Sequence, residues 1–236
     1  MQKVVLSLGG SVLIPSLESN TILRYVPVLR EVGASCRLFI VVGGGGEARR
    51  YIGASRALGI DEASSDEVGI TITRLNARLL LGALGASAYP RVAQDYTDAK
   101  EFGETGKIVV MGGVTPGQTT DTVSAVLAEC VGADVLINTT SVDGIYSADP
   151  RKDPAAVRFP TLTPRQLSEI VRGERLNAGS NSVFDLVAAK VIERSGIPLI
   201  VFDGKNPENL RSAIFRGEFV GTVVSEEKKS PLPLGR

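Results

Sequence analysis

Short apolar runs alternate along the chain with longer segments whose apolar residues recur every three or four positions. The runs predict strands at residues 4–8, 37–42, 107–111, 134–138, 199–202 and 222–224. The segments between them predict helices, the clearest at 119–131, 163–171 and 182–194. Because strands that alternate with helices form mostly parallel sheets with helices on their faces, we expect an α/β fold.

Two local patterns add detail to this outline. Ser64 and Glu67 form a capping-box pattern at the start of a long helix. The apolar residues of this helix fall at spacings of four, three and four, so they share one helix face. They are Val68, Ile72, Leu75 and Leu79. Farther along, Asp143 and Gly144 predict the tight turn of a hairpin within residues 142–146.

Length and charge limit the protein class. The chain has 236 residues and no evident linker, so we expect a single domain over residues 1–224 and a flexible tail at 225–236. Lysine plus arginine and aspartate plus glutamate both total 26, which gives no global attraction to nucleic acid or to a membrane surface. No apolar run approaches the ~20 residues of a membrane helix, and no leader-like segment begins the chain. We expect a soluble, cytoplasmic protein.

The chain contains no histidine. This excludes Ser-His-Asp and Cys-His catalysis as well as histidine metal ligands, and we identify no set of protein metal ligands. Cys36 and Cys130 lie far apart among apolar neighbours. They predict two reduced thiols in the core and no disulfide.

Glycine pairs or runs follow three of the predicted strands, at residues 9–10, 43–46 and 112–113. Glycine between a strand and a helix lets the backbone approach a ligand and aims unpaired N–H groups at an anion. A tight turn without a ligand explains any one of these runs equally well. All three together favour a phosphate-binding crevice at one edge of the sheet.

A second interpretation of the longest glycine run is dinucleotide binding. Residues 43–48 match the G-x-G-x-x-A fingerprint, and Asp61 lies near the distance expected for its acidic residue. In that motif the acid ends a second strand, whereas Asp61 leads into a helix. We therefore disfavour dinucleotide binding, and the P-loop sequence is absent.

Several polar residues near the glycine runs have two interpretations each. Arg49 can reach a phosphate held by the second run, or it can be a solvated surface arginine. Asp66 suits the positive end of a helix whether or not it binds a ligand. Thr119, Thr120 and Asp121 are good helix-capping residues in any protein.

Five segments in this order resemble the amino-acid-kinase family, and within it the archaeal-type UMP kinases. They are LGGSVL at 8–13, VVGGGGEARRYI at 41–52, ITRLNA at 72–77, MGGVTPGQTTD at 111–121 and VDGIYSADP at 142–150. The resemblance covers residues 4–224. It implies a three-layer αβα sandwich that assembles as a homohexamer and transfers the γ-phosphoryl group of ATP to UMP in pyrimidine nucleotide synthesis. Mg²⁺ would accompany ATP.

The resemblance also implies roles for individual residues on the ATP side. Gly9 and Gly10 would approach the transferring phosphates, with Gly45 and Arg49 near the same phosphates. The nucleoside of ATP would contact Thr140, Tyr146 and Asp149. The residues expected to act at the reacting centre are Gly10, Arg49 and Asp121, the last as its organiser.

On the acceptor side, the resemblance implies that Gly44 contacts UMP and that Asp66 holds its ribose. The uridine and its phosphate would be lined by one loop. Its residues are Val114, Thr115, Pro116, Gly117, Gln118, Thr119 and Thr120. The acceptor-binding part would thus be amino-terminal and the ATP-binding part carboxy-terminal.

The chain departs from the family pattern at two cationic positions. Many members have lysine where this chain has Ser7, and bacterial UMP kinases have lysine where it has Ser141. We expect Arg49, the metal and the helix ends to replace these charges. Isopentenyl phosphate kinases rely on a histidine that is missing here, and acetylglutamate kinases normally keep the lysines. A non-catalytic oxyanion- or nucleotide-binding protein on the same fold is the alternative from a different class.

Overall fold

The computed structural model describes residues 1–150, 152–176 and 184–235. Its described strands form one seven-stranded sheet in the order β3-β2-β1-β4-β6-β7-β5. In chain order they are β1 (Lys3–Leu8), β2 (Arg37–Val42), β3 (Val109–Met111), β4 (Val135–Thr140), β5 (Thr161–Leu162), β6 (Leu199–Asp203) and β7 (Gly221–Val224). Neighbours pair in parallel from β3 to β6, and only the β6–β7 pairing among these strands is antiparallel.

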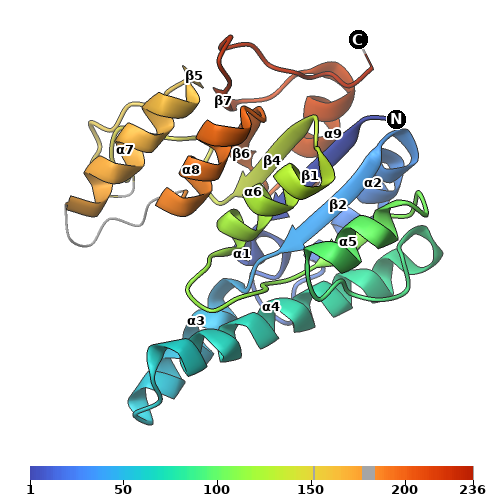
Figure 1. Cartoon of the computed structure of the whole chain (residues 1–236), viewed down its shortest axis with the longest axis vertical. Coiled ribbons are helices and arrows are strands. Elements are labelled where there is room, and N and C mark those ends of the chain that lie inside the picture. Colours follow the sequence, from blue (N-terminus) through green and yellow to red (C-terminus); the bar gives the residue numbers. More distant parts are fainter. Residues whose placement is uncertain (151, 177–183, 236) are drawn as a thin grey trace.

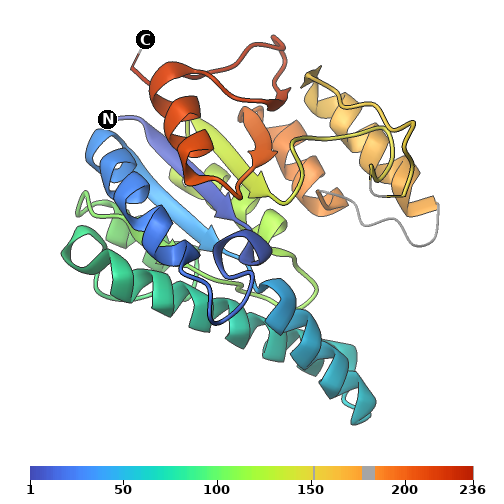
Figure 2. The same cartoon turned by 180° about the vertical axis from the view of Figure 1, so that it is seen from behind.

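Helices cover both faces of the sheet (Figures 1 and 2). In chain order they are α1 (Gly10–Leu13), α2 (Thr21–Ser35), α3 (Gly45–Ala57), α4 (Glu62–Leu84), the 3₁₀ turn η1 (Gly85–Ser87), α5 (Tyr96–Gly103), α6 (Thr120–Val131), α7 (Pro164–Leu176), α8 (Leu186–Ser195) and α9 (Pro207–Arg216). Core residues of α2, α4 and α9 pack on one face, and those of α5, α6, α7 and α8 pack on the other. The expected α/β sandwich with a mostly parallel sheet is confirmed.

The central strands are apolar at consecutive positions because both of their faces are buried. In β1, Val4, Leu6 and Leu8 belong to the core beside α2, whereas Val5 belongs to the core beside α6. Side chains of a strand point alternately to opposite faces, so a doubly covered strand needs apolar residues throughout. This explains why the short runs located the central strands.

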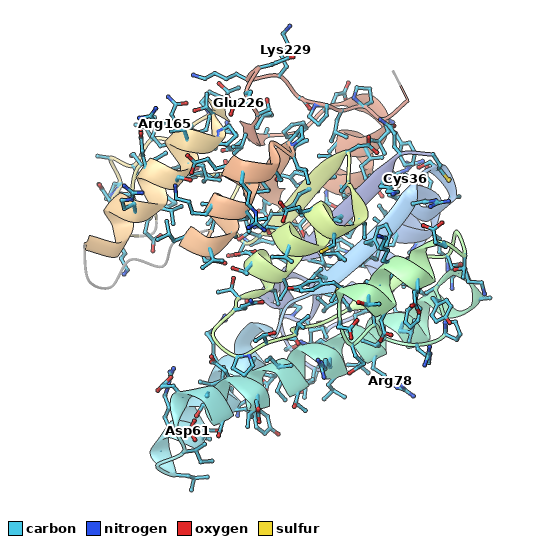
Figure 3. The ribbon with its side chains drawn as sticks, in the orientation of Figure 1. Cys36, Asp61, Arg78, Arg165, Glu226 and Lys229 are labelled. Atoms are coloured by element: carbon cyan, nitrogen blue, oxygen red, sulfur yellow. The ribbon has the colours of Figure 1, made fainter. Side chains whose placement is uncertain are left out.

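The long helix begins differently from the prediction. Asp61, not Ser64, is its N-cap, and the Asp61 carboxylate accepts a hydrogen bond from the Ser64 N–H at 2.9 Å. Figure 3 shows Asp61 at the far end of the arm that α3 and α4 form beyond the sheet. The capping-box interpretation is wrong because an aspartate three residues earlier already caps the helix.

None of its four periodic apolar residues belongs to either core, and Val68 and Ile72 are only half-buried. Leu75 is 55% exposed and Leu79 is 46% exposed. The buried residues of α4 are instead small or polar along much of its length, including Gly69, Thr73 and Asn76. The stripe of Val68, Ile72, Leu75 and Leu79, hereafter the α4 stripe, therefore does not pack against the sheet.

Residues 142–146 do not form the predicted hairpin. Tyr146 instead makes an antiparallel bridge to Arg158, and the Ser147 N–H donates to the Val157 carbonyl at 3.0 Å. The Asp143-Gly144 pair thus lies in a bend before this pairing. Farther along, α8 begins at Leu186, later than predicted, and residues 182 and 183 lie outside the described residues.

The segment after β7 packs on the body, unlike the frayed tail expected from its composition. Leu232 is 7% exposed within the core beside α2 and α9. The Leu234 N–H donates to the Ile214 carbonyl at 3.0 Å, and the Gly235 N–H donates to Gln2 Oε1 at 2.9 Å. These contacts bring the carboxy-terminal segment beside the start of β1.

The prediction of two core thiols is correct for one cysteine and wrong for the other. Cys36 is buried, as expected, and Figure 3 labels it where α2 leads into β2. Cys130 is exposed, so the prediction that it is a core thiol is wrong. Within the described ranges, every helix is too short or too polar to cross a bilayer.

Candidate functional site

A cavity of about 340 Å³ lies where β1, β2 and β4 end. The chain first builds the sheet outward from β1 to β2 and β3, then returns to place β4 on the other side of β1. Crevices at such a reversal are the usual ligand sites of open α/β sheets. The lining comprises Ser7, residues 9–12, 43–45 and 48–49, Ile52, Asp66, residues 69–70, Thr73, Gly113 and residues 118–121 and 138–141.

The first two glycine turns pack directly on one another inside this lining. A Cβ atom added to Gly10 would overlap the Gly43 carbonyl and the Gly45 nitrogen. Gly45 also has a φ of 66°, which disfavours any side chain. Close packing of two backbones therefore requires these glycines, and it brings both turns to one point.

The second turn leads into α3 with its amides unpaired. In the described part of the chain, the N–H groups of Gly44 and Gly45 donate to no backbone or side-chain acceptor. Gly44 is the N-cap of α3, and no side chain of residues 1–150, 152–176 or 184–235 caps this end. Unpaired amides at a helix N-terminus form an anion site.

The third glycine turn, at residues 112–113, differs from the prediction because the Gly113 amide is already hydrogen-bonded. The Gly113 N–H donates to Thr73 Oγ1 at 2.7 Å, and the Gly113 carbonyl accepts from Arg74 Nε at 3.1 Å. Both backbone groups of Gly113 are therefore satisfied by α4. This turn lies in the cavity wall, but its Gly113 amide is not free for a phosphate.

Asp66 joins α4 to the loop that follows β3. Its Oδ2 accepts from the Gly117 N–H at 2.7 Å, and its side chain lines the cavity. Of the loop residues predicted to bind the acceptor, the cavity lining includes Gln118, Thr119 and Thr120. Val114, Thr115, Pro116 and Gly117 stand outside that lining.

Arg49 lies on the first turns of α3 and is the only lysine or arginine in the described cavity lining. Its Nη2 donates to Ser11 Oγ at 3.3 Å, across the two glycine turns. Its neighbour Arg50 pairs with Glu47 instead. Of the two interpretations of Arg49, the geometry favours the one at the site.

Asp121 lies at the start of α6, with Thr119 as the N-cap of that helix. Asp121 Oδ1 accepts from Asn138 Nδ2 at 3.2 Å and from Ser7 Oγ at 3.4 Å. Burial, and next to it the charge of Asp185, raise the pKa of the Asp121 carboxyl to about 7. Burial favours the neutral form of an acid, and no cation at position 7 offsets it.

Asp185 is held beside this group by the cap of α6. Its carboxylate accepts from Thr119 Oγ1 and, at 2.8 Å, from Thr122 Oγ1. It also caps α8 by accepting from the Ala188 N–H at 2.9 Å. Two carboxyl groups thus flank the start of α6.

The residues predicted for the ATP nucleoside are only partly gathered. Thr140 lies in the cavity lining, with Ser141 beside it, but Tyr146 and Asp149 do not. The Tyr146 hydroxyl donates to Asp143 Oδ1 at 2.6 Å. Tyr146 and Asp149 lie on the segment that follows β4, outside the cavity lining.

Sequence reasoning missed four polar residues that build the site: Thr73, Asn76, Asn138 and Asp185. Thr73 and Asn76 interrupt a helical stretch rich in apolar residues, and Asn138 interrupts a strand. Asp185 precedes the apolar run of a helix, which is an N-cap signal. A polar residue at a buried position needs a partner, and that requirement could have identified Thr73, Asn76 and Asn138.

The comparisons with known proteins agree with this geometry. A sequence model of the amino acid kinase family matches residues 2–203. The uridylate kinase of Methanoculleus marisnigri is 66% identical over 233 residues, which cover 99% of this chain and 100% of that protein. The uridylate kinase of Methanosarcina acetivorans is 49% identical over 232 residues, with 98% and 96% coverage.

Solved structures give the same result. The crystal structure of uridylate kinase from Archaeoglobus fulgidus matches with a TM-score of 0.85 and 48% identity, covering 95% of this chain and 100% of that one. The UMP kinase of Bacillus anthracis matches with a TM-score of 0.76 at 23% identity, covering 96% of each chain, which supports the fold alone. Its sequence, its sheet order and its glycine-lined cavity together show that the chain belongs to the amino acid kinase family.

Proposed function

We propose that the chain is a uridylate kinase, which transfers the γ-phosphoryl group of ATP to UMP and yields ADP and UDP. The observation that carries this proposal is the full-length identity of 66% to a uridylate kinase. The cavity supports it, because it gathers glycine amides, Arg49 and Asp66 at one edge of the sheet. The rival kinases named above and a non-catalytic binding protein lack comparable support.

The acceptor and the donor would occupy different ends of the cavity. Asp66 on α4 is hydrogen-bonded to the loop that leads to Gln118, Thr119 and Thr120, and together they suit a nucleoside and its monophosphate. Thr140 lies at the end of β4 on the other side of β1 and suits the ATP nucleoside. Gly10 and Gly45 lie between them, where the two phosphate chains would meet. We infer that residues 1–224 work as one kinase domain divided in this way.

The chemistry requires alignment and charge neutralisation more than a general base. A phosphate-monoester oxygen is largely ionised near neutral pH, so it can attack without losing a proton to the protein. The unpaired amides at the α3 N-terminus and the Arg49 guanidinium would stabilise charge on the transferred group. The absence of histidine from the sequence therefore costs this reaction nothing.

Mg²⁺ fits as a partner of ATP. Among the described residues, no group of three or more acidic, histidine or cysteine side chains could hold a metal ion by itself. Mg²⁺ is commonly held by substrate phosphates, water and one or two carboxylates, and it neutralises phosphate charge. Asp121 would face that ion through water, with one oxygen already held by Asn138.

The proposed self-association and the proposed cytoplasmic location rest on separate arguments. The α4 stripe exposes apolar side chains in a row, with Leu75 55% exposed, and such a surface suits burial against another copy. This supports self-association, and the homohexamer that the family resemblance implies would use the stripe for one of its contacts. The two nucleotide substrates belong to the interior of the cell, which supports a cytoplasmic location.

An acceptor assay tests the activity. With ATP and Mg²⁺, the purified protein is expected to convert UMP to UDP faster than it phosphorylates CMP, dUMP or isopentenyl phosphate. Product formation would be measured by chromatography. Turnover of isopentenyl phosphate without UMP would favour the rival kinase, and nucleotide binding without turnover would favour a binding protein.

The D66N variant tests the acceptor half. Losing a charged acceptor for the ribose is expected to raise KM for UMP about tenfold while KM for ATP changes less than about twofold. Glu67, the exposed neighbour on α4, gives the matched control E67Q, which should change neither. Equal effects of D66N on both substrates would contradict the division of the cavity.

A further inference from the structure

One buried amide on α4 holds the glycine turn that precedes α3. Asn76 is 4% exposed. Its Nδ2 donates to the Gly43 carbonyl at 2.9 Å and to the Gly44 carbonyl at 3.3 Å. Its neighbours on the same helix, Ala77 and Leu80, belong to the apolar core. An apolar residue would suit that position, since a buried amide is costly unless it is paired.

The two bonds fix the orientation of two peptide groups. In a trans peptide, the carbonyl of one residue and the N–H of the next point in opposite directions. Asn76 holds the Gly43 and Gly44 carbonyls toward α4, so the N–H groups of Gly44 and Gly45 point away from α4. Both residues line the cavity, and neither N–H has a partner in the described chain.

Thr73, one turn earlier on α4, does the reverse. It accepts the Gly113 N–H at 2.7 Å and so removes that amide from the cavity. The two α4 residues therefore decide which glycine amides are available to a ligand. Amides of the α3 turn are freed, and the amide of Gly113 is occupied.

We propose that Asn76 is a positioning residue that orients the Gly44 and Gly45 amides to bind nucleotide phosphate. This rests on the proposed kinase function for its substrates, although the orientation of the amides does not depend on which nucleotide binds. The family resemblance implies that Gly44 contacts the acceptor and that Gly45 lies near the ATP phosphates. Loss of Asn76 should therefore weaken binding of both substrates, unlike loss of Asp66.

The kinetic test uses two variants of similar volume. N76L removes the amide, and N76D replaces the donor with oxygens that repel the two carbonyls. Both are expected to lower kcat/KM for UMP and for ATP by about 10- to 100-fold, with N76D the more severe. L80A is the control, because it removes core volume one turn away without touching a glycine turn, and its KM values should stay within twofold of wild type.

A spectroscopic test separates positioning from mere stability. In the wild-type protein, the ¹H–¹⁵N signals of Gly44 and Gly45 are expected to shift when pyrophosphate is added, and these shifts should be lost in N76L but kept in L80A. This readout uses no UMP, so it remains informative if UMP is not the substrate. If N76L does not fold, N76S serves in its place. Wild-type kinetics and wild-type amide shifts in the folded variant would overturn the proposal.

Discussion

Asp121 is a buried carboxyl group whose protonation is set by several polar neighbours. It lies in the cavity lining with Asn138 and Ser7 donating to the same oxygen, and Asp185 lies close enough to disfavour its charge. A cation at position 7 would stabilise the ionised form, but this chain has serine there. Because its pKa is raised to about 7, this carboxyl is partly protonated near neutral pH, and a nearby positive charge would favour its ionisation.

This arrangement predicts a pH-dependent cost to stability. Because the pKa of Asp121 is raised to about 7, the folded state binds more protons than the unfolded state between pH 4 and 7, so stability falls as pH rises through that range. D121N removes the ionisation and should stabilise the ligand-free protein at pH 8 by on the order of 1 to 3 kcal/mol, but much less at pH 5.

Urea unfolding in the presence of a chelator, at both pH values, measures the difference. Glu101 is an exposed residue of α5, and its variant E101Q provides a control of the same charge change. An equal effect of D121N at pH 5 and pH 8 would show that the carboxyl does not titrate in this range.

At the scale of elements, α4 organises the acceptor side of the cavity. Asp66, Thr73 and Asn76 recur at helical spacing and contact the loop after β3 and the turns after β3 and β2. One helix thereby contacts two segments that are distant in sequence, residues 43–44 after β2 and residues 113–117 after β3. The helix begins at the cap that Asp61 provides, at the far end of the arm.

The cap gives a prediction that separates the two possible starts of α4. D61A removes the acceptor of the Ser64 N–H and should lower the free energy of unfolding by about 1 kcal/mol. S64A removes only an exposed hydroxyl bond and should cost a few tenths of that amount. Thermal unfolding of both variants measures this, and a larger loss in S64A would restore the capping-box interpretation.

The same helix shows what sequence patterns can and cannot reveal. Periodicity located α4, but the face shared by Val68, Ile72, Leu75 and Leu79 is not the face that packs in the core. Small and polar residues face inward because the glycine turns approach too closely for large side chains: a Cβ on Gly112 would lie 2.7 Å from Thr73 Oγ1. Strand runs were reliable because burial on two faces leaves only apolar residues.

Loop geometry was the least predictable part of the site. The glycine runs located the cavity, and Thr119 was recognised as a cap residue, which the structure confirms. The use of the Gly113 amide by Thr73 depends on a contact across 40 positions of the chain. Local propensity contains no information about such a partner, so the third turn was wrongly expected to be free.

At the scale of the whole molecule, the α4 stripe is an apolar surface that the single chain leaves uncovered. Its leucines are exposed along a helix that extends beyond the sheet (Figure 1). Isolated exposed leucines are ordinary, whereas a row on one helix face indicates a contact surface. This is why the stripe supports the proposed self-association.

Charged substitutions in the stripe test this directly. The double variant L75E/L79E is expected to dissociate the assembly into smaller species, measured by light scattering coupled to size-exclusion chromatography. Leu23 is 69% exposed on α2 and is not part of the stripe, so L23E should leave the mass unchanged. An unchanged mass for the double variant would show that the stripe is not an interface.

The hydrogen bond between Gly235 and Gln2 has a practical consequence for engineering. Both ends of the described chain meet near the start of β1, and the cavity opens beyond its last residue, about 20 Å along the strand. A short peptide joining the ends should permit circular permutation, and an affinity tag or fluorescent fusion placed there would stand clear of arriving nucleotides.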